Sequence, residues 1–109
     1  MAITYKTLAQ SAPSATTNTD VYTVGASKQA VISTITVCNR SSSSATYRIA
    51  VRPDGATLAN QHYLAYDVTL TGNDTVALTL GITIDASDVI TVYASTANLS
   101  FNLFGSEIA

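Results

Sequence analysis

Apolar side chains alternate with polar or small ones along most of this chain. In the clearest run, 76–84 (VALTLGITI), every second residue is apolar. This period of two predicts a strand with one face toward a core and the other toward solvent or another chain. Gly81 lies inside the run, and we expect a bulge or bend there, where the strand passes from one sheet to another.

Similar patterns recur through the rest of the sequence. The other alternating stretches and shorter strand candidates lie at 3–9, 20–24, 46–52, 64–70 and 98–103. Residues 29–39 (QAVISTITVCN) and 88–95 (DVITVYAS) are apolar at consecutive positions, so we expect central strands covered on both faces. Polar segments such as 41–44 and 71–74 separate the strands, as turns do.

About eight short strands in 109 residues predict one all-β domain over 1–109. We expect a single antiparallel β-sandwich or jelly-roll-like domain. Residues 1–19 are expected to form an N-terminal strand or extended arm and a linker, because Ala9–Asp20 is rich in Ala, Ser and Thr and contains Pro13.

The composition narrows the classes of function. Hydrophobic residues make up 47% and charged residues 11%, with a net charge of −2. Disorder and nucleic-acid binding are disfavoured, because the chain is neither highly charged nor basic. Soluble domains carry about 25% charged residues. So low a fraction of charged residues favours a protein that associates with its own copies or with a repeating lattice.

The chain offers few residues for chemistry. One histidine and one cysteine cannot form a zinc site, and the glycines stand singly, so no phosphate loop is present. Asp85 and Asp88 suit turn capping better than calcium binding, which needs more oxygen ligands. Cys38 cannot form an internal disulfide and is expected as a small core residue. We therefore expect no catalytic, cofactor or metal residues, and no enzymatic activity.

The sequence shows neither a signal-peptide pattern nor a long apolar segment. The first residues lack the basic segment and apolar run of a signal peptide, and no stretch approaches 18 apolar residues. We expect a protein made in the cytoplasm, with no membrane partner.

Several side chains point away from the expected core. Arg48 and Arg52 share a strand face, and two interpretations stay open: solvated arginines, or ion pairs with an Asp of another subunit. Tyr63 and Tyr66 are expected on opposite faces of one strand, so one must look outward. Phe104 is out of phase with Leu103. The residues expected at an interface are Tyr5, Arg48, Arg52, His62, Tyr63, Tyr66 and Phe104.

Four segments carry a resemblance to a known group of proteins. They are VCNR (Val37–Arg40), YRIAVRP (Tyr47–Pro53), ANQHY (Ala59–Tyr63) and FNLFGSE (Phe101–Glu107). With the opening and closing stretches, they resemble small virion structural proteins of tailed bacteriophages, particularly marine and cyanobacterial ones. The likeness covers almost the whole chain, although Gly25 stands where a Pro is expected.

The resemblance implies a place in the virion, with two roles open. The first is a capsid decoration or cement protein, docked on the head as an oligomer, in particular a trimer, against the major capsid protein. The second is a tail, baseplate or fibre component that acts as an adaptor or binds the host surface. Glycan binding in that role would need an exposed aromatic platform, which Tyr63 or Tyr66 could provide.

Overall fold

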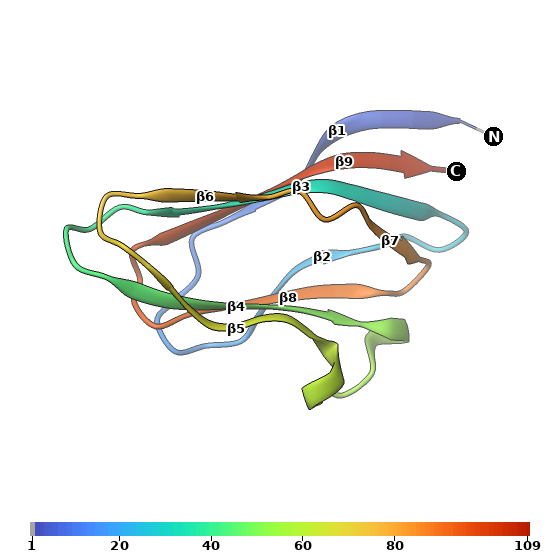
Figure 1. Cartoon of the computed structure of the whole chain (residues 1–109). Coiled ribbons are helices and arrows are strands. Elements are labelled where there is room, and N and C mark those ends of the chain that lie inside the picture. The colour runs from blue at the N-terminus through green and yellow to red at the C-terminus, as the bar shows by residue number, and fades with distance from the viewer. Residues whose placement is uncertain (1) are drawn as a thin grey trace.

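Alternating apolar and polar positions arrange the chain as two antiparallel sheets that face each other (Figure 1). The computed structural model describes residues 2–109, so Met1, the first residue of the predicted domain and arm, lies outside the described residues. The strands are β1 (Ile3–Ser11), β2 (Thr19–Thr23), β3 (Gln29–Asn39), β4 (Ala45–Arg52), β5 (Tyr63–Leu70), β6 (Thr75–Leu78), β7 (Ile82–Asp85), β8 (Val89–Ala94) and β9 (Leu99–Ile108). Two 3₁₀ turns, η1 (Pro53–Gly55) and η2 (Asn60–His62), precede β5.

The strand order interleaves distant parts of the chain. One sheet has the order β1-β9-β3-β6, with β7 also paired to β3, and the other has the order β2-β8-β4-β5. Every pair is antiparallel. The predicted all-β, antiparallel, two-layer architecture is confirmed.

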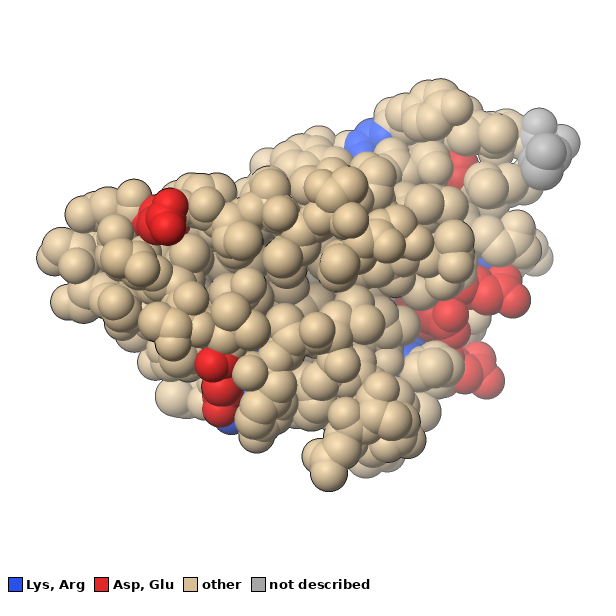
Figure 2. Space-filling view, viewed as in Figure 1, with Lys and Arg blue, Asp and Glu red and all other residues tan. Residues whose placement is uncertain are grey.

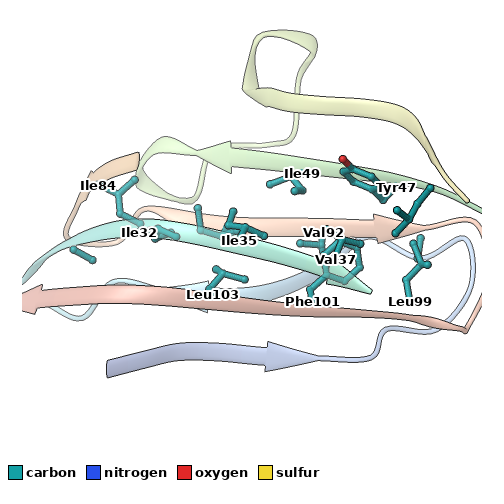
Figure 3. Close-up of a cluster of buried hydrophobic side chains, with 14 of the residues drawn as sticks. Ile32, Ile35, Val37, Tyr47, Ile49, Ile84, Val92, Leu99, Phe101 and Leu103 are labelled. Carbon is teal, nitrogen blue, oxygen red and sulfur yellow. The ribbon is translucent and has the colours of Figure 1, made fainter. Parts of the chain in front are cut away.

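The core lies between the inner faces of the two sheets (Figure 3). Its largest fully buried side chains include Ile32, Ile35, Ile49, Leu99, Phe101 and Leu103. The rings of Tyr47 and Phe101 meet edge to face, with centroids 6.5 Å apart. Each large apolar side chain buried in this way contributes about 1.5–3 kcal/mol to folding. These contacts hold the sheets together and fix which residues face outward.

The run 76–84 is divided into two strands, which raises the count to nine. Gly81 has a φ of 62°, and Leu80 beside it is 51% exposed rather than in the core. The bend at Gly81 is confirmed. The predicted passage between sheets is wrong, because β6 and β7 both pair with β3.

β5 departs from the predicted alternation. Leu64, Tyr66 and Val68 were expected on the core face but are exposed, while Ala65 packs against the core. Two register shifts against β4 explain the outward position of Leu64 and Tyr66, since each shift places an extra residue on β5. Val68 pairs with the buried Tyr47 without a shift, and it is 40% exposed on β5, which is the edge strand of its sheet. Asp67 lies in the shift between Tyr47 and Ile49 of β4, and it has a φ of 50°.

The N-terminal segment is a strand followed by a link. The strand β1 pairs with β9 along its whole length, with one register shift between Thr7 and Ala9. Residues 12–18 then cross to β2 in the other sheet. Cys38 is only partly buried, on a position of β3 that alternates with the buried Val37 and Asn39, so its prediction as a core residue is wrong.

Candidate functional site

An apolar strip lies on the outer face of the five-stranded sheet. Leu103 is buried, so Phe104 and Ile108 on the alternate positions of β9 point outward. Ile3 lies opposite Ile108, and cross-strand partners share a face. We name Ile3, Tyr5, Phe104 and Ile108 the β1–β9 patch. Ile3 is 50%, Tyr5 82% and Phe104 37% exposed, so the strip is available for contact with another molecule.

The charged side chains of the same two strands take the opposite face. Lys6 Nζ donates to Glu107 Oε1 at 3.2 Å, and the Tyr22 hydroxyl of β2 donates to Glu107 Oε2 at 2.5 Å. The hydrogen bonds from Tyr22 and Lys6 lower the pKa of Glu107. Burial, and then the bond to this carboxylate, raise the pKa of Tyr22. This cluster ties the two sheets together at one end and keeps charge away from the β1–β9 patch.

A second group of side chains lies on the outer face of the four-stranded sheet. The Arg48 guanidinium lies 4.3 Å from the ring centroid of Tyr66 and 4.2 Å from that of Tyr93. Arg48 Nε and Nη2 donate to the two carboxylate oxygens of Asp67 at 2.6 and 3.3 Å. The Tyr63 ring meets the Tyr66 ring edge to face, with centroids 4.8 Å apart. We name these five residues the tyrosine–arginine cluster.

Electrostatics and stacking fix this cluster. The hydrogen bond to Asp67 raises the pKa of Arg48, so the guanidinium keeps its charge. A cation over an aromatic face contributes about 0.5–1 kcal/mol at an exposed site, and Arg48 makes two such contacts. Beside the cluster, Asn60, Tyr63 and Tyr66 line a shallow pocket of about 250 Å³.

Arg52 and His62 serve the fold of their own chain. Arg52 donates to Asp20 Oδ2 at 2.8 Å and to Thr91 Oγ1 at 3.0 Å. It also donates to the backbone carbonyls of Gly55 and Ala56, at the end of η1. His62 Nδ1 accepts the backbone N–H of Ala59 at 3.0 Å, which closes η2. Both of the arginines expected at an interface therefore have an aspartate of their own chain as a partner.

Charged groups are few over the rest of the surface. Figure 2 shows them as separate groups on a face that is otherwise uncharged. Within residues 2–109, the ion pairs are Lys6–Glu107, Arg48–Asp67 and Arg52–Asp20.

The structure sorts the seven expected interface residues into three sets. Tyr5 and Phe104 lie together in the β1–β9 patch. Arg48, Tyr63 and Tyr66 lie together on the other outer face. Arg52 and His62 belong to neither group. The prediction that Tyr63 and Tyr66 occupy opposite faces is wrong, because the register shifts of β5 bring their rings into contact.

Sequence patterns gave no indication of Tyr93, Asp67 and Asn60. Tyr93 lies opposite Arg48 in the β4–β8 pair, and no local pattern shows that pairing. Asp67 reaches Arg48 only because β5 bulges, and Asn60 enters the pocket from η2. The sequence did contain a pattern that indicates Ile3 as a surface residue, since Ile3 lies two positions before Tyr5 and therefore on the same face of the strand.

Among residues 2–109, no group of three or more His, Cys, Asp or Glu side chains is placed to hold a metal ion. That part of the chain also contains no helix with the length and apolar character needed to cross a membrane. Comparison with protein-family models, with curated proteins and with solved structures finds no match.

Proposed function

We propose that this chain is a non-enzymatic structural protein of a tailed-phage virion. Its first role in this proposal is as a capsid decoration or cement protein, made in the host cytoplasm and docked on the head. It binds the major capsid protein as an oligomer, in particular a homotrimer. The observation that carries the proposal is the β1–β9 patch, where large apolar side chains are exposed on a regular sheet face.

The chemistry of the patch supports a docking role. Scattered exposed apolar residues are ordinary, but a contiguous group on one face is typical of an interaction surface. Aromatic residues are enriched at such surfaces and charged residues depleted from their centres. Lys6 and Glu107 satisfy each other on the inner side, so a partner covering the patch would not have to desolvate them.

The strand order also supports the proposal. If β6 and β7 are counted as one interrupted sixth strand, β8 and β9 become the seventh and eighth strands. The sheets then have the orders 1-8-3-6 and 2-7-4-5. We propose that this is a jelly roll, an architecture found in viral capsid and lectin domains. In the same proposal, β1 takes the place of the expected arm, and its free edge lies against a neighbouring subunit.

Removal and add-back of the protein test the decoration role. Heads stripped of the protein are expected to leak DNA at lower temperature, and purified protein should restore them. The double variant Tyr5→Ser/Phe104→Ser should fold but fail to restore them. Leu64→Ser, which changes an exposed apolar residue on the other sheet, is the matched control. Unchanged leakage from stripped heads, or full restoration by the double variant, would contradict the role.

A tail, baseplate or fibre role is the second candidate. The tyrosine–arginine cluster favours it, because tyrosine and arginine are enriched where a few residues dominate binding. An adaptor or host-surface binder would use this outer face rather than the β1–β9 patch. Labelling intact particles with an antibody against the protein separates the roles, since a head protein labels the shell and a tail protein labels one vertex or the tail.

A further inference from the structure

The pocket beside the tyrosine–arginine cluster has the size of a small ligand. Its volume is about 250 Å³, just below the roughly 300 Å³ at which pockets for drug-sized molecules begin. It is open to solvent and lined by two aromatic rings and one carboxamide. Such a site accepts one ring-sized group rather than an extended ligand.

The aromatic wall of this pocket is built before any ligand arrives. Tyr66 is 56% exposed, yet Arg48 stacks on its ring and Tyr63 meets it edge to face. Asp67 holds Arg48 through two hydrogen bonds. Because these contacts fix the ring in place, a ligand that stacks on it loses less conformational entropy on binding.

The charges around the pocket cancel. Arg48 is the cation of the site and Asp67 neutralises it directly, so neither an anion nor a cation finds a free counter-ion there. The aromatic faces carry negative charge density and attract weakly positive C–H groups. The Asn60 carboxamide supplies two N–H donors and one acceptor oxygen. The pocket therefore suits a neutral ligand that combines a C–H face with hydroxyl groups.

We propose that Asn60, Tyr63 and Tyr66 form a binding site for one neutral pyranose ring of a glycan. The sugar's C–H face stacks on an aromatic ring, and its hydroxyls exchange hydrogen bonds with the Asn60 carboxamide. A proline-rich peptide is another neutral ligand that aromatic walls bind, but it occupies an extended groove with successive contacts. A single pocket of this volume fits a sugar better. The site does not depend on where in a virion the protein lies.

Chemical-shift titration of the ¹⁵N-labelled full chain tests the proposal. The probes are maltohexaose, cellohexaose, chitohexaose and mannohexaose, with decaproline as the competing ligand class. At least one hexasaccharide is expected to shift the amides of Asn60, Tyr63 and Tyr66, with a dissociation constant on the order of 1 mM. Tyr66→Ala should weaken that binding about tenfold or more, and Tyr66→Phe should retain it within about threefold, because the ring remains.

Two further variants test the role of the carboxamide and serve as a control for the loss of a tyrosine outside the pocket. Asn60→Ala leaves the rings in place and should weaken binding by about fivefold through the lost hydrogen bonds. Tyr5→Ala removes a tyrosine that is even more exposed but lies on the other sheet, and it should leave binding unchanged. The spectra of the free variants report whether each one is folded.

Three results would overturn the proposal. They are no shifts at the pocket with any of the four hexasaccharides, shifts that persist in Tyr66→Ala, or saturation of the pocket by decaproline alone. None of these results bears on the β1–β9 patch, so failure here and failure of the decoration role are distinguishable.

Discussion

Asn39 is the buried polar residue whose replacement should lower the free energy of unfolding most. It lies at the end of β3 and is 1% exposed. Its Nδ2 donates to the carbonyl of Ser43 at 2.8 Å and to that of Leu70 at 3.2 Å, with Thr71 O at 3.4 Å. Its Oδ1 accepts the backbone N–H of Ser41 at 3.1 Å and the Ser41 hydroxyl at 3.0 Å. One side chain thus joins the β3–β4 loop to the β5–β6 loop.

The expected effect of Asn39→Ala follows from these bonds. A carboxamide has two N–H groups and two lone pairs, so about four of the contacts can be well formed at once. Each hydrogen bond contributes a net of about 0.5–1.5 kcal/mol. Ser43 is exposed and recovers water when its partner is lost, whereas the carbonyl of the buried Leu70 is less able to do so. We expect a loss of roughly 2–4 kcal/mol, a large share of the 5–15 kcal/mol typical of a domain.

Urea unfolding followed by circular dichroism measures this loss. Asn98→Ala is the matched control, because Asn98 is exposed in a neighbouring loop and its side chain makes no hydrogen bond within residues 2–109. It should change the free energy of unfolding by less than about 0.5 kcal/mol. If Asn39→Ala also stays within about 0.5 kcal/mol of the wild type, the proposed linkage of the two loops is refuted.

Three further predictions concern the packing of the core, the pH dependence of stability, and the contact between the backbones of β3 and β9. Leu103→Ala should cost roughly 2–4 kcal/mol of stability in the same urea assay, whereas the exposed Leu80→Ala should cost less than about 0.5 kcal/mol; equal losses would contradict the assigned core. Because the folded state lowers the pKa of Glu107, that residue stabilises the fold above the unfolded glutamate pKa of about 4.3, and the contribution is lost as pH falls through the folded pKa. The stability gap between wild type and Glu107→Gln should therefore shrink toward acid in urea titrations, and a gap that widens would reverse the assigned sign. A Cβ on Gly105 would lie 1.9 Å from the Val31 carbonyl oxygen of β3. Gly105→Ala should therefore lower Tm by roughly 5 °C or more in a calorimetric scan. An unchanged Tm would contradict this close approach of β3 and β9.

The fold class was predictable because period-two alternation is a local property. It located the strands to within a few residues, except that it joined β6 and β7 into one run, and it correctly separated the buried Leu103 from the outward Phe104. β8 is covered on both faces as its apolar run predicts, because Arg52 and Asp20 fold over Thr91 on its outer side. The prediction that 29–39 is covered on both faces is wrong: the outer positions of β3 stay partly exposed, because the five-stranded sheet packs against the other sheet on its inner face only.

The errors arise where pairing between strands overrides the local pattern. The apolar phase of 64–70 predicts Leu64 and Tyr66 inside, but two register shifts against β4 turn them outward. The partner of a bulged strand sets such shifts, so the sequence of β5 alone does not show them. Similarly, Asp67 and Tyr93 meet Arg48 only after three strands have paired. The individual aromatic and arginine residues were predictable, but their assembly into one cluster was not.

The most direct test of the central claim is the abundance of this protein in purified mature virions, measured by quantitative mass spectrometry against the major capsid protein. A decoration protein is predicted to be present in a fixed ratio of the same order as the capsid subunit, and to be lost together with head stability on stripping. A much smaller, fixed ratio would indicate the tail role. Absence from mature particles, together with a monomer in analytical ultracentrifugation, would contradict the account.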